Sequence, residues 1–410
     1  MSSFYSDIVD HQSISWDKLI ADLIELKSYN PFCFKKSYYE IFIRLIFSML
    51  NGKKITLLDS DLSEQEIFEL TGHHDLSVFE KDIELKKIPS TKTALINALL
   101  ETKESWQITL YTSGTTGKPK SVSHSFKSIT RSLKLYPDNQ LQVWGFSYLP
   151  THMAGIQVFL QAVLNGNSIV RLIGLGKTEM LDAILEHQIT HISATPTFYR
   201  LLLPINTEFL TIIKLTSGGE KFDTSLKAHL SKVFPNASFT NVYASTEVGA
   251  LFGSNGEFFE VKDSLKEYIK IQGNELFIHQ SLLGISMQNN AIWYNTGDLV
   301  EIHSNEPLSF KFKSRKSDLI NVGGFKINVL EVEDALLRIP EIRQARVFAK
   351  SNSVLGNILC CELDTISELT ESEIRKILSS DLQEVKIPRV IKFVDQITTT
   401  PTGKIKRKVA

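Results

Sequence analysis

Tyr111-Thr112-Ser113-Gly114-Thr115-Thr116-Gly117-Lys118-Pro119-Lys120 is the stretch of sequence on which the fold prediction depends. The run before it, residues 106–110, is typical of a strand that ends at a loop. Glycines let backbone N–H groups approach an anion closely, and hydroxyl and ammonium groups complete a phosphate cradle. Only Thr115 and Thr116 separate Gly114 from Gly117, whereas a Walker A loop has four residues there. Taken alone, the stretch fits a phosphate-binding loop and a flexible surface turn equally well.

Length and composition indicate an ordinary globular protein with two or more domains. The chain has 410 residues, more than one hydrophobic core normally serves, with 42% hydrophobic and 22% charged residues. A formal net charge of -1 favours neither nucleic acid nor a membrane as partner. Three cysteines, Cys33, Cys360 and Cys361, make no disulfide framework and fit a cytoplasmic location. The first ten residues lack the basic-then-apolar pattern of a signal peptide.

Apolar runs and helical patterns alternate between residues 168 and 243. Strands are predicted at 168–172, 189–194, 212–216 and 239–243, and helices at 177–187, 196–203 and 224–234. Connections of this length imply right-handed βαβ crossovers and a parallel sheet. Ligands bind such sheets at the carboxyl ends of the strands, where polar segments occur at 195–197, 216–220 and 243–247.

The flanking regions predict further layers. Helices are expected at 37–50, 61–70, 125–136 and 156–164, and strands at 54–58 and 145–149. Residues 251–312 alternate in short runs that are typical of a small antiparallel sheet. The predicted fold class is α/β: a large N-terminal domain of parallel βαβ sheets with a small β-subdomain, followed by a small, mobile α+β C-terminal domain.

Several short motifs occur in order along the chain. They are Thr112–Lys118, Leu149–Gly155, Tyr243–Glu247, Thr296–Asp298 and Pro401–Lys404. They resemble the signatures of the adenylate-forming superfamily, which includes acyl- and aryl-CoA ligases, firefly luciferase and peptide-synthetase adenylation domains. Alone, His152 fits a satisfied loop residue, Glu247 a solvated carboxylate and Asp298 a turn former. The shared order of the motifs favours the functional interpretation.

The resemblance implies ATP-dependent activation of a small-molecule carboxylic acid, with Mg²⁺ as cofactor and CoA as co-substrate. The implied ATP-binding residues are Thr112, Ser113, Gly114, Thr115, Thr116, Gly117, Lys118, Ser217, Gly218, Gly219, Glu220, Tyr243, Ala244, Ser245, Thr246, Asp298, Arg315 and Lys404. The implied catalytic residues are Lys404, His152, Thr112 and Glu247, of which Glu247 would also hold Mg²⁺. The acid and the thiol would contact His152, Gly155, Ile156, Phe198, Gly218, Gly323 and Gly324.

The charged segment at residues 313–327 resembles the hinge of this superfamily. It implies an N-terminal domain of residues 1–314, a hinge at 315–317 with Ser317 as pivot, and a C-terminal domain of residues 318–410. Both half-reactions need the same carbonyl carbon, so a rotation would replace Lys404 by Gly323 and Gly324. The Ser-Asp form of the pivot resembles o-succinylbenzoate–CoA ligases, whereas many relatives have Gly in place of Ser314 and Asp or Lys in place of Ser317.

The acid and the thiol acceptor stay open. No Asp lies between Gly145 and Gly166 to pair with a substrate ammonium, so an amino acid is disfavoured. Small or apolar residues favour an aryl or short acyl group, and Gln157 either binds a second polar group or faces solvent. One alternative is an enzyme that loads a carrier protein supplied in trans. Another is a degenerate nucleotide-binding member, suggested by the short segment before the loop, against which intact Lys404, Glu247 and Asp298 argue.

Overall fold

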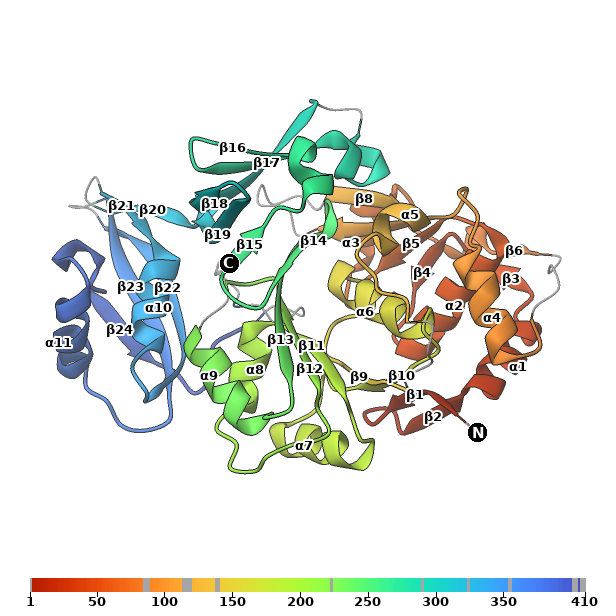
Figure 1. Ribbon diagram of the computed structural model, residues 1–410, viewed down its shortest axis with the longest axis horizontal. Helices are drawn as coiled ribbons and strands as arrows, with labels where there is room; N and C mark the ends of the chain where they lie inside the picture. The colour runs from red at the N-terminus through yellow and green to blue at the C-terminus, as the bar shows by residue number, and fades with distance from the viewer. Residues whose placement is uncertain are drawn as a thin grey trace.

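The computed structural model describes residues 2–83, 89–112, 120–136, 141–221, 224–288, 291–322, 325–352, 356–399 and 405, without the side chains of Thr112, Asn352 and Gly356. In Figure 1 the N-terminal elements, in red and orange, lie at one end, and the C-terminal elements, in blue, lie at the other. The green strands of the central region lie between them.

The largest sheet has eight strands in the order β14-β13-β12-β11-β9-β10-β1-β2. In chain order these are β1 (Ser3–Asp7), β2 (Gln12–Ser15), β9 (Val143–Phe146), β10 (Ser168–Arg171), β11 (His191–Ala194), β12 (Lys214–Gly218), β13 (Ser238–Ser245) and β14 (Gly249–Ser254). All neighbours from β13 to β1 are parallel, and only the outer pairs are antiparallel. The predicted parallel sheet is confirmed.

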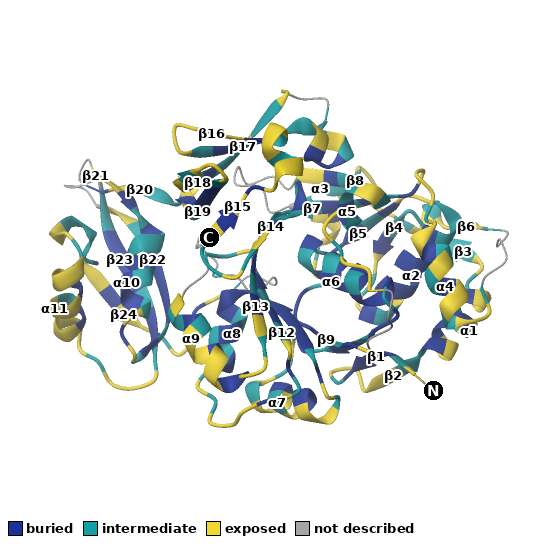
Figure 2. Ribbon diagram, in the orientation of Figure 1, coloured by how far each residue is buried: buried dark blue, intermediate teal, exposed yellow. Residues whose placement is uncertain are grey.

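Helices cover both faces of this sheet (Figures 1 and 2). Alternate residues of β9 enter opposite cores, because side chains of a strand point to opposite faces. One core contains α1 (Trp16–Glu25), α2 (Tyr38–Asn51), α4 (Lys92–Leu100) and α6 (Met153–Val163), with Phe42 stacked on Phe159 at 4.4 Å. The other contains α7 (Lys177–Glu186), α8 (Pro196–Leu202) and α9 (Thr224–Val233).

A second sheet holds the strand that leads to the glycine-rich stretch. Its order is β4-β5-β7-β8, formed by β4 (Phe32–Phe34), β5 (Ile55–Leu58), β7 (Gln107–Thr112) and β8 (Lys120–Ser125). The first three strands are parallel. A short pair, β3 (Ser28–Tyr29) and β6 (Lys81–Asp82), lies apart from it, and α3 (Glu64–Thr71) begins at a capping box formed by Ser63 and Glu66.

The helix expected at 125–136 is shorter than predicted. It is α5 (Phe126–Thr130), and the chain then turns. Pro137 follows in the sequence and disfavours helical conformation before it. The side chains of Gln161 and Asn165 bind the backbone of Lys134 and Tyr136, so these backbone groups are satisfied without helical hydrogen bonds.

The predicted antiparallel β-subdomain is confirmed. Its order is β15-β19-β18-β17-β16, formed by β15 (Phe258–Glu260), β16 (Ile269–Gln272), β17 (Glu275–His279), β18 (Trp293–Asn305) and β19 (Leu308–Arg315). The last part of the chain has a core of its own. It contains β20 (Leu319–Val322), β21 (Phe325–Asn328), α10 (Val329–Leu337), β22 (Ile342–Asn352), β23 (Gly356–Thr365), α11 (Glu371–Asp381) and β24 (Val390–Phe393).

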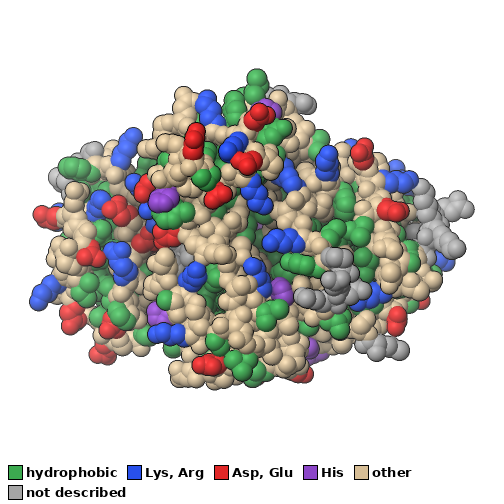
Figure 3. Space-filling view, viewed as in Figure 1, with side chains coloured by type: hydrophobic (Ala, Val, Ile, Leu, Met, Phe, Trp, Pro, Cys, Tyr) green, Lys and Arg blue, Asp and Glu red, His purple; other side chains and the backbone are tan. Residues whose placement is uncertain are grey.

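The surface carries mixed charges. Basic and acidic side chains are interspersed over the face drawn in Figure 3, as expected for a formal net charge of -1. No helix in the described part of the chain has both the length and the apolar character that crossing a bilayer requires.

Candidate active site

The carboxyl ends of adjacent parallel strands bring two predicted segments together. β12 ends at Gly218 and pairs with β13, with Gly218 opposite Val242. Gly219 has φ +82°, a conformation that glycine adopts without strain. The turn after β12 therefore lies beside the Tyr243–Glu247 segment, as the sequence predicted for a site at the strand ends.

Asp298 is the centre of a buried polar cluster. Its carboxylate is only 2% exposed, accepts a hydrogen bond from the Tyr243 hydroxyl at 2.5 Å and forms an ion pair with Arg315 at 2.9 Å. Burial raises the pKa of the Asp298 carboxyl, and Arg315 and Tyr243 oppose this rise. The cluster joins Tyr243 on β13 to Asp298 on β18 and Arg315 at the end of β19, two residues that pair directly across neighbouring strands.

The Tyr243 ring is buried among other aromatic rings and does not present an open face for a base to stack on. The residue is 9% exposed and packs with Phe252 and Phe259, at ring separations of 5.7 Å and 6.3 Å. Its hydroxyl is engaged by Asp298. The observed contacts thus make Tyr243 a support for the Asp298 carboxylate, and its implied role in ATP binding stays a prediction.

The Thr246–Glu247 segment is held by residues that the sequence did not single out. His124 on β8 is fully buried, and its Nε2 hydrogen-bonds the Thr246 carbonyl at 2.7 Å. The Gly284 N–H donates to the Glu247 carbonyl at 2.7 Å. Burial lowers the pKa of His124, so the ring is neutral and donates from Nε2. No sequence motif marks His124, because its partner lies 122 residues away.

The Glu247 side chain is available for a ligand. It is partly buried, and no residue of the described part of the chain hydrogen-bonds its carboxylate. Within the described ranges there is no group of three or more His, Cys, Asp or Glu side chains that could hold a metal ion. A divalent cation at Glu247 would therefore need ligands from a bound molecule, as is usual for Mg²⁺ on a nucleotide.

Glu220 has a structural contact. Its carboxylate accepts hydrogen bonds from the Thr197 N–H at 2.9 Å and the Thr197 hydroxyl at 3.0 Å. Thr197 is in the first turn of α8, where backbone N–H groups lack partners within the helix. Glu220 thereby fixes the turn that contains Gly218 and Gly219. The next residue, Lys221, forms an ion pair with Asp334 on α10, which joins the central region to the C-terminal elements.

His152 lies directly before α6, as expected. Its Nε2 is 2.9 Å from the Asp59 carboxylate, and the neighbouring Thr151 hydroxyl also donates to Asp59. Gly155 follows in the first turn of α6, where a Cβ atom would lie 2.0 Å from the Leu149 carbonyl oxygen. This close approach explains why glycine stands there.

The remaining predicted residues divide into three groups. Ile156 and Ser217 are fully buried, and no described residue hydrogen-bonds the Ser217 hydroxyl, while Phe198 packs on α8 beside Tyr199. Ala244 and Ser245 end β13, and Ser317 lies in the short 3₁₀ segment between β19 and β20. Outside the described residues lie Ser113, Gly114, Thr115, Thr116, Gly117, Lys118, Gly323, Gly324 and Lys404, and of Thr112 only the backbone is described.

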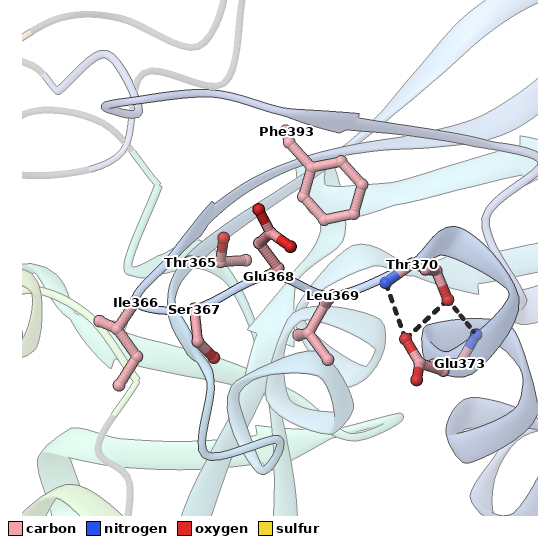
Figure 4. A pocket seen from close by; sticks show the side chains of 8 residues that line it. All are labelled: Thr365, Ile366, Ser367, Glu368, Leu369, Thr370, Glu373 and Phe393. Atoms are coloured by element: carbon pink, nitrogen blue, oxygen red, sulfur yellow. Dashed lines mark hydrogen bonds between the residues drawn. The ribbon is translucent and has the colours of Figure 1, made fainter.

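A cavity of about 710 Å³ in the C-terminal elements has a different character (Figure 4). None of its lining residues is a predicted site residue. Thr370 and Glu373, which line it, are engaged in the capping box of α11, with the Thr370 hydroxyl donating to Glu373 at 2.6 Å. These two residues therefore serve the helix end, and the candidate site is the strand-end region described above.

Comparisons with known proteins agree with this arrangement. Residues 50–273 match the family described as AMP-binding enzyme, and residues 331–404 match its C-terminal domain. Bacitracin synthase 3 from Bacillus licheniformis is 26% identical over an alignment of 345 residues that covers 73% of this chain but only 5% of the synthase. A 2-succinylbenzoate–CoA ligase from Staphylococcus epidermidis is 28% identical over an alignment of 329 residues that covers 73% of this chain and 68% of the ligase.

A solved structure shows the same fold. The o-succinylbenzoate–CoA synthetase from Bacillus subtilis, in complex with its acyl-adenylate intermediate, has a TM-score of 0.70 at 19% identity. The likeness covers 99% of this chain and 94% of that one. With the family match extending over more than half of the chain, the superfamily resemblance is confirmed, and the chain belongs to the AMP-binding enzyme family.

Proposed function

We propose that the chain is an AMP-forming acid–thiol ligase. It activates a carboxylic acid with ATP to an acyl-adenylate, releases pyrophosphate, and transfers the acyl group to the thiol of CoA. The observation that carries this proposal is the Asp298 cluster. A buried carboxylate with a hydroxyl donor on one oxygen and a guanidinium on the other has lone pairs left to accept hydrogen bonds from both hydroxyls of a ribose.

The strand-end region supports the same assignment for the nucleotide. Gly218 and Gly219 leave backbone exposed for a flat base, and Glu220 holds that turn against α8. Thr246 would contact the α-phosphate. His124 hydrogen-bonds the Thr246 carbonyl and so holds this residue in place. The residues at 112–118, with Lys118, would cradle the leaving phosphates.

Mg²⁺ fits the residues present. Glu247 provides a carboxylate that no described residue engages, and Mg²⁺ commonly takes one carboxylate with the rest of its ligands from phosphate and water. When bound, it would neutralise charge that develops on the phosphates. His124 and Gly284 hold the backbone of Glu247 and Thr246 and so keep the carboxylate in place.

Two half-reactions follow from these groups. In the first, a carboxylate oxygen attacks the α-phosphorus, and the bond to pyrophosphate breaks in line, with Lys404 bridging the carboxylate and the α-phosphate. In the second, the CoA thiol loses its proton and its sulfur attacks the acyl carbon, and AMP leaves with the electron pair. Both steps need one carbon, so the C-terminal domain must exchange faces about Ser317. This proposal includes a hinge at residues 315–317 between the N-terminal and C-terminal domains.

A carrier-protein phosphopantetheine thiol is the alternative acceptor. The chain is similar to part of bacitracin synthase 3, and its motifs resemble peptide-synthetase adenylation domains as well as CoA ligases. In this variant the first half-reaction is unchanged, and the carrier protein is supplied in trans. The free, buried state of Cys33, Cys360 and Cys361 is compatible with the cytoplasm as the expected compartment for either acceptor.

The test is pyrophosphate release from Mg·ATP across a panel of aryl and aliphatic acids, with and without CoA. Acid-dependent release that multiplies on addition of CoA is the expected result. Release that stops near one equivalent of enzyme would favour the carrier-protein variant. No acid-dependent release across the panel, from protein that still binds ATP, would contradict the proposal and favour a nucleotide-binding role.

A further inference from the structure

Asp59 is a carboxylate at the edge of the candidate site that the motifs do not include. It directly follows β5, which pairs in parallel with β7 through Thr56 and Thr109. β5 therefore lies beside β7, the strand that leads to the predicted phosphate loop, and Asp59 is the first residue after β5.

Two hydrogen bonds join Asp59 to the loop between β9 and α6. The Thr151 hydroxyl donates to one carboxylate oxygen, and His152 Nε2 lies 2.9 Å from the other. Thr151 is buried, whereas the side chains of Asp59 and His152 are 31% and 28% exposed. The contact therefore joins the second sheet to the first at a place that a small molecule can reach.

The carboxylate determines the form of the histidine ring. Burial raises the pKa of Asp59, but the hydrogen bonds from His152 and Thr151 and the charge of His152 outweigh this, so its pKa is lowered. An ionised carboxylate only accepts hydrogen bonds, so His152 must carry a hydrogen on Nε2. The other ring nitrogen, Nδ1, is hydrogen-bonded by no described residue.

We propose that Asp59 is a positioning residue that fixes the orientation and the Nε2–H tautomer of His152 at the entrance to the acid-binding site. The inference rests on the proposed function for the identity of the substrate. With both oxygens of Asp59 engaged in hydrogen bonds, its carboxylate is held against His152 and Thr151. The ring is then held in one orientation at the entrance to the acid-binding site.

Asp59→Asn tests this assignment with almost no change in shape. The Asn oxygen can accept from Thr151, which leaves its NH₂ group to donate to His152 Nε2. The ring hydrogen should therefore move to Nδ1, which ¹⁵N chemical shifts of the histidine ring report directly in the full chain. Loss of a signal in His152→Gln assigns the resonance among the ten histidines.

Kinetics provide the second readout. At saturating Mg·ATP, Asp59→Asn should raise KM for the acid by about tenfold, because the charge-assisted hydrogen bond that orients the His152 ring is replaced by a weaker neutral one, with KM for ATP unchanged. Asp61→Asn is the matched control, since Asp61 is exposed in the same loop and no described residue hydrogen-bonds its side chain. It should retain both the tautomer and the KM values.

Asp59→Glu separates positioning from general support of the fold. It retains an acceptor, so the Nε2–H form should persist even where the ring shifts. An unchanged tautomer in Asp59→Asn, or a changed tautomer in Asp59→Glu, would overturn the inference. The ring readout needs no substrate, so it decides the inference even if no acid supports pyrophosphate release, which would contradict only the proposed function.

Discussion

The Tyr243 hydroxyl donates a hydrogen bond of 2.5 Å to the carboxylate of Asp298, across 55 residues of sequence and from a separate sheet. The acceptor is 2% exposed, so the carboxylate has little access to water. A buried carboxylate is costly unless donors satisfy it. The pair therefore places one ordered anionic group between the β13 strand end and the segment before the proposed hinge.

Tyr243→Phe should weaken nucleotide binding. The substitution leaves one oxygen of Asp298 without its donor, so the carboxylate loses its fixed orientation. We expect KM for ATP to rise by about tenfold and the free energy of unfolding to fall by about 1–3 kcal/mol. Tyr268→Phe is the control, because the Tyr268 hydroxyl bonds no described residue and its ring still packs on His279. Equal effects of the two substitutions would contradict the role of the Asp298 pair.

His124→Gln should reduce the fall in the free energy of unfolding that occurs as the pH is lowered. Burial lowers the pKa of His124 below 6.5, so below pH 6.5 the unfolded chain takes up a proton that the folded chain does not. The wild-type free energy of unfolding should therefore fall as pH decreases, by up to about 1.4 kcal/mol per pH unit from this residue. Urea denaturation from pH 7.5 to pH 5 measures the slope.

Two other histidines control that measurement. His191, whose pKa is lowered to about 4 by burial and by Lys214, remains in both proteins and cancels in the difference. His229→Gln, at an exposed position, should reproduce the wild-type slope. If His124→Gln keeps the full wild-type slope, the buried neutral state of this ring is refuted.

Gly155→Ala should destabilise the first turn of α6. A Cβ atom would lie 2.0 Å from the Leu149 oxygen, a backbone atom that cannot move without shifting the strand before it. Overpacking of this kind costs about 1–3 kcal/mol, and displacement of His152 should also raise KM for the acid. Gly256→Ala is the matched control, since nothing lies within 4 Å of its added Cβ. Comparable melting temperatures for the two variants would show that the contact is tolerated.

Lys221→Glu should affect the two half-reactions unequally. Lys221 and Asp334 join the turn after β12 to α10, so charge reversal disfavours the domain arrangement seen here. The side chains are 31% and 33% exposed, and such pairs contribute about 0.2–1 kcal/mol. Single-turnover assays of adenylate formation and of thioester formation from synthetic acyl-adenylate should show one step slowed. Lys221→Asp combined with Asp334→Lys should restore the rate of that step. Equal slowing of both steps would contradict a role of this ion pair in holding one domain arrangement.

Lys404→Ala should separate adenylation from thioester formation. If Lys404 bridges the acid and the α-phosphate, its loss should abolish acid-dependent pyrophosphate release. Thioester formation from synthetic acyl-adenylate should persist, because the proposed rotation moves Lys404 away from that step. Lys392→Ala, on exposed β24 surface of the same domain, is the control. Equal loss of both steps in Lys404→Ala would contradict the two-state assignment.

Some contacts of the site could have been suspected before the structure. Asp59 follows a strand that the sequence predicted, and a carboxylate at such a strand end is a candidate for a site. No motif links Asp59 to His152, however, because the two residues are 93 positions apart in the sequence. Lys221 and Asp334 carried no such signal, since charged residues on exposed turns and helices are common.

The sequence by itself determined the alternation of strands and helices, the capping box of α3 and the order of the motifs. These features depend on side-chain periodicity and on hydrogen bonds between residues a few positions apart, so they do not require contacts between distant parts of the chain. Tertiary structure alone decided that His124 holds Thr246, that Tyr243 holds Asp298, and that α5 ends at Thr130. Each depends on sheet register and on packing between elements far apart in sequence, which bring donors and acceptors within 3 Å only once the whole core is formed.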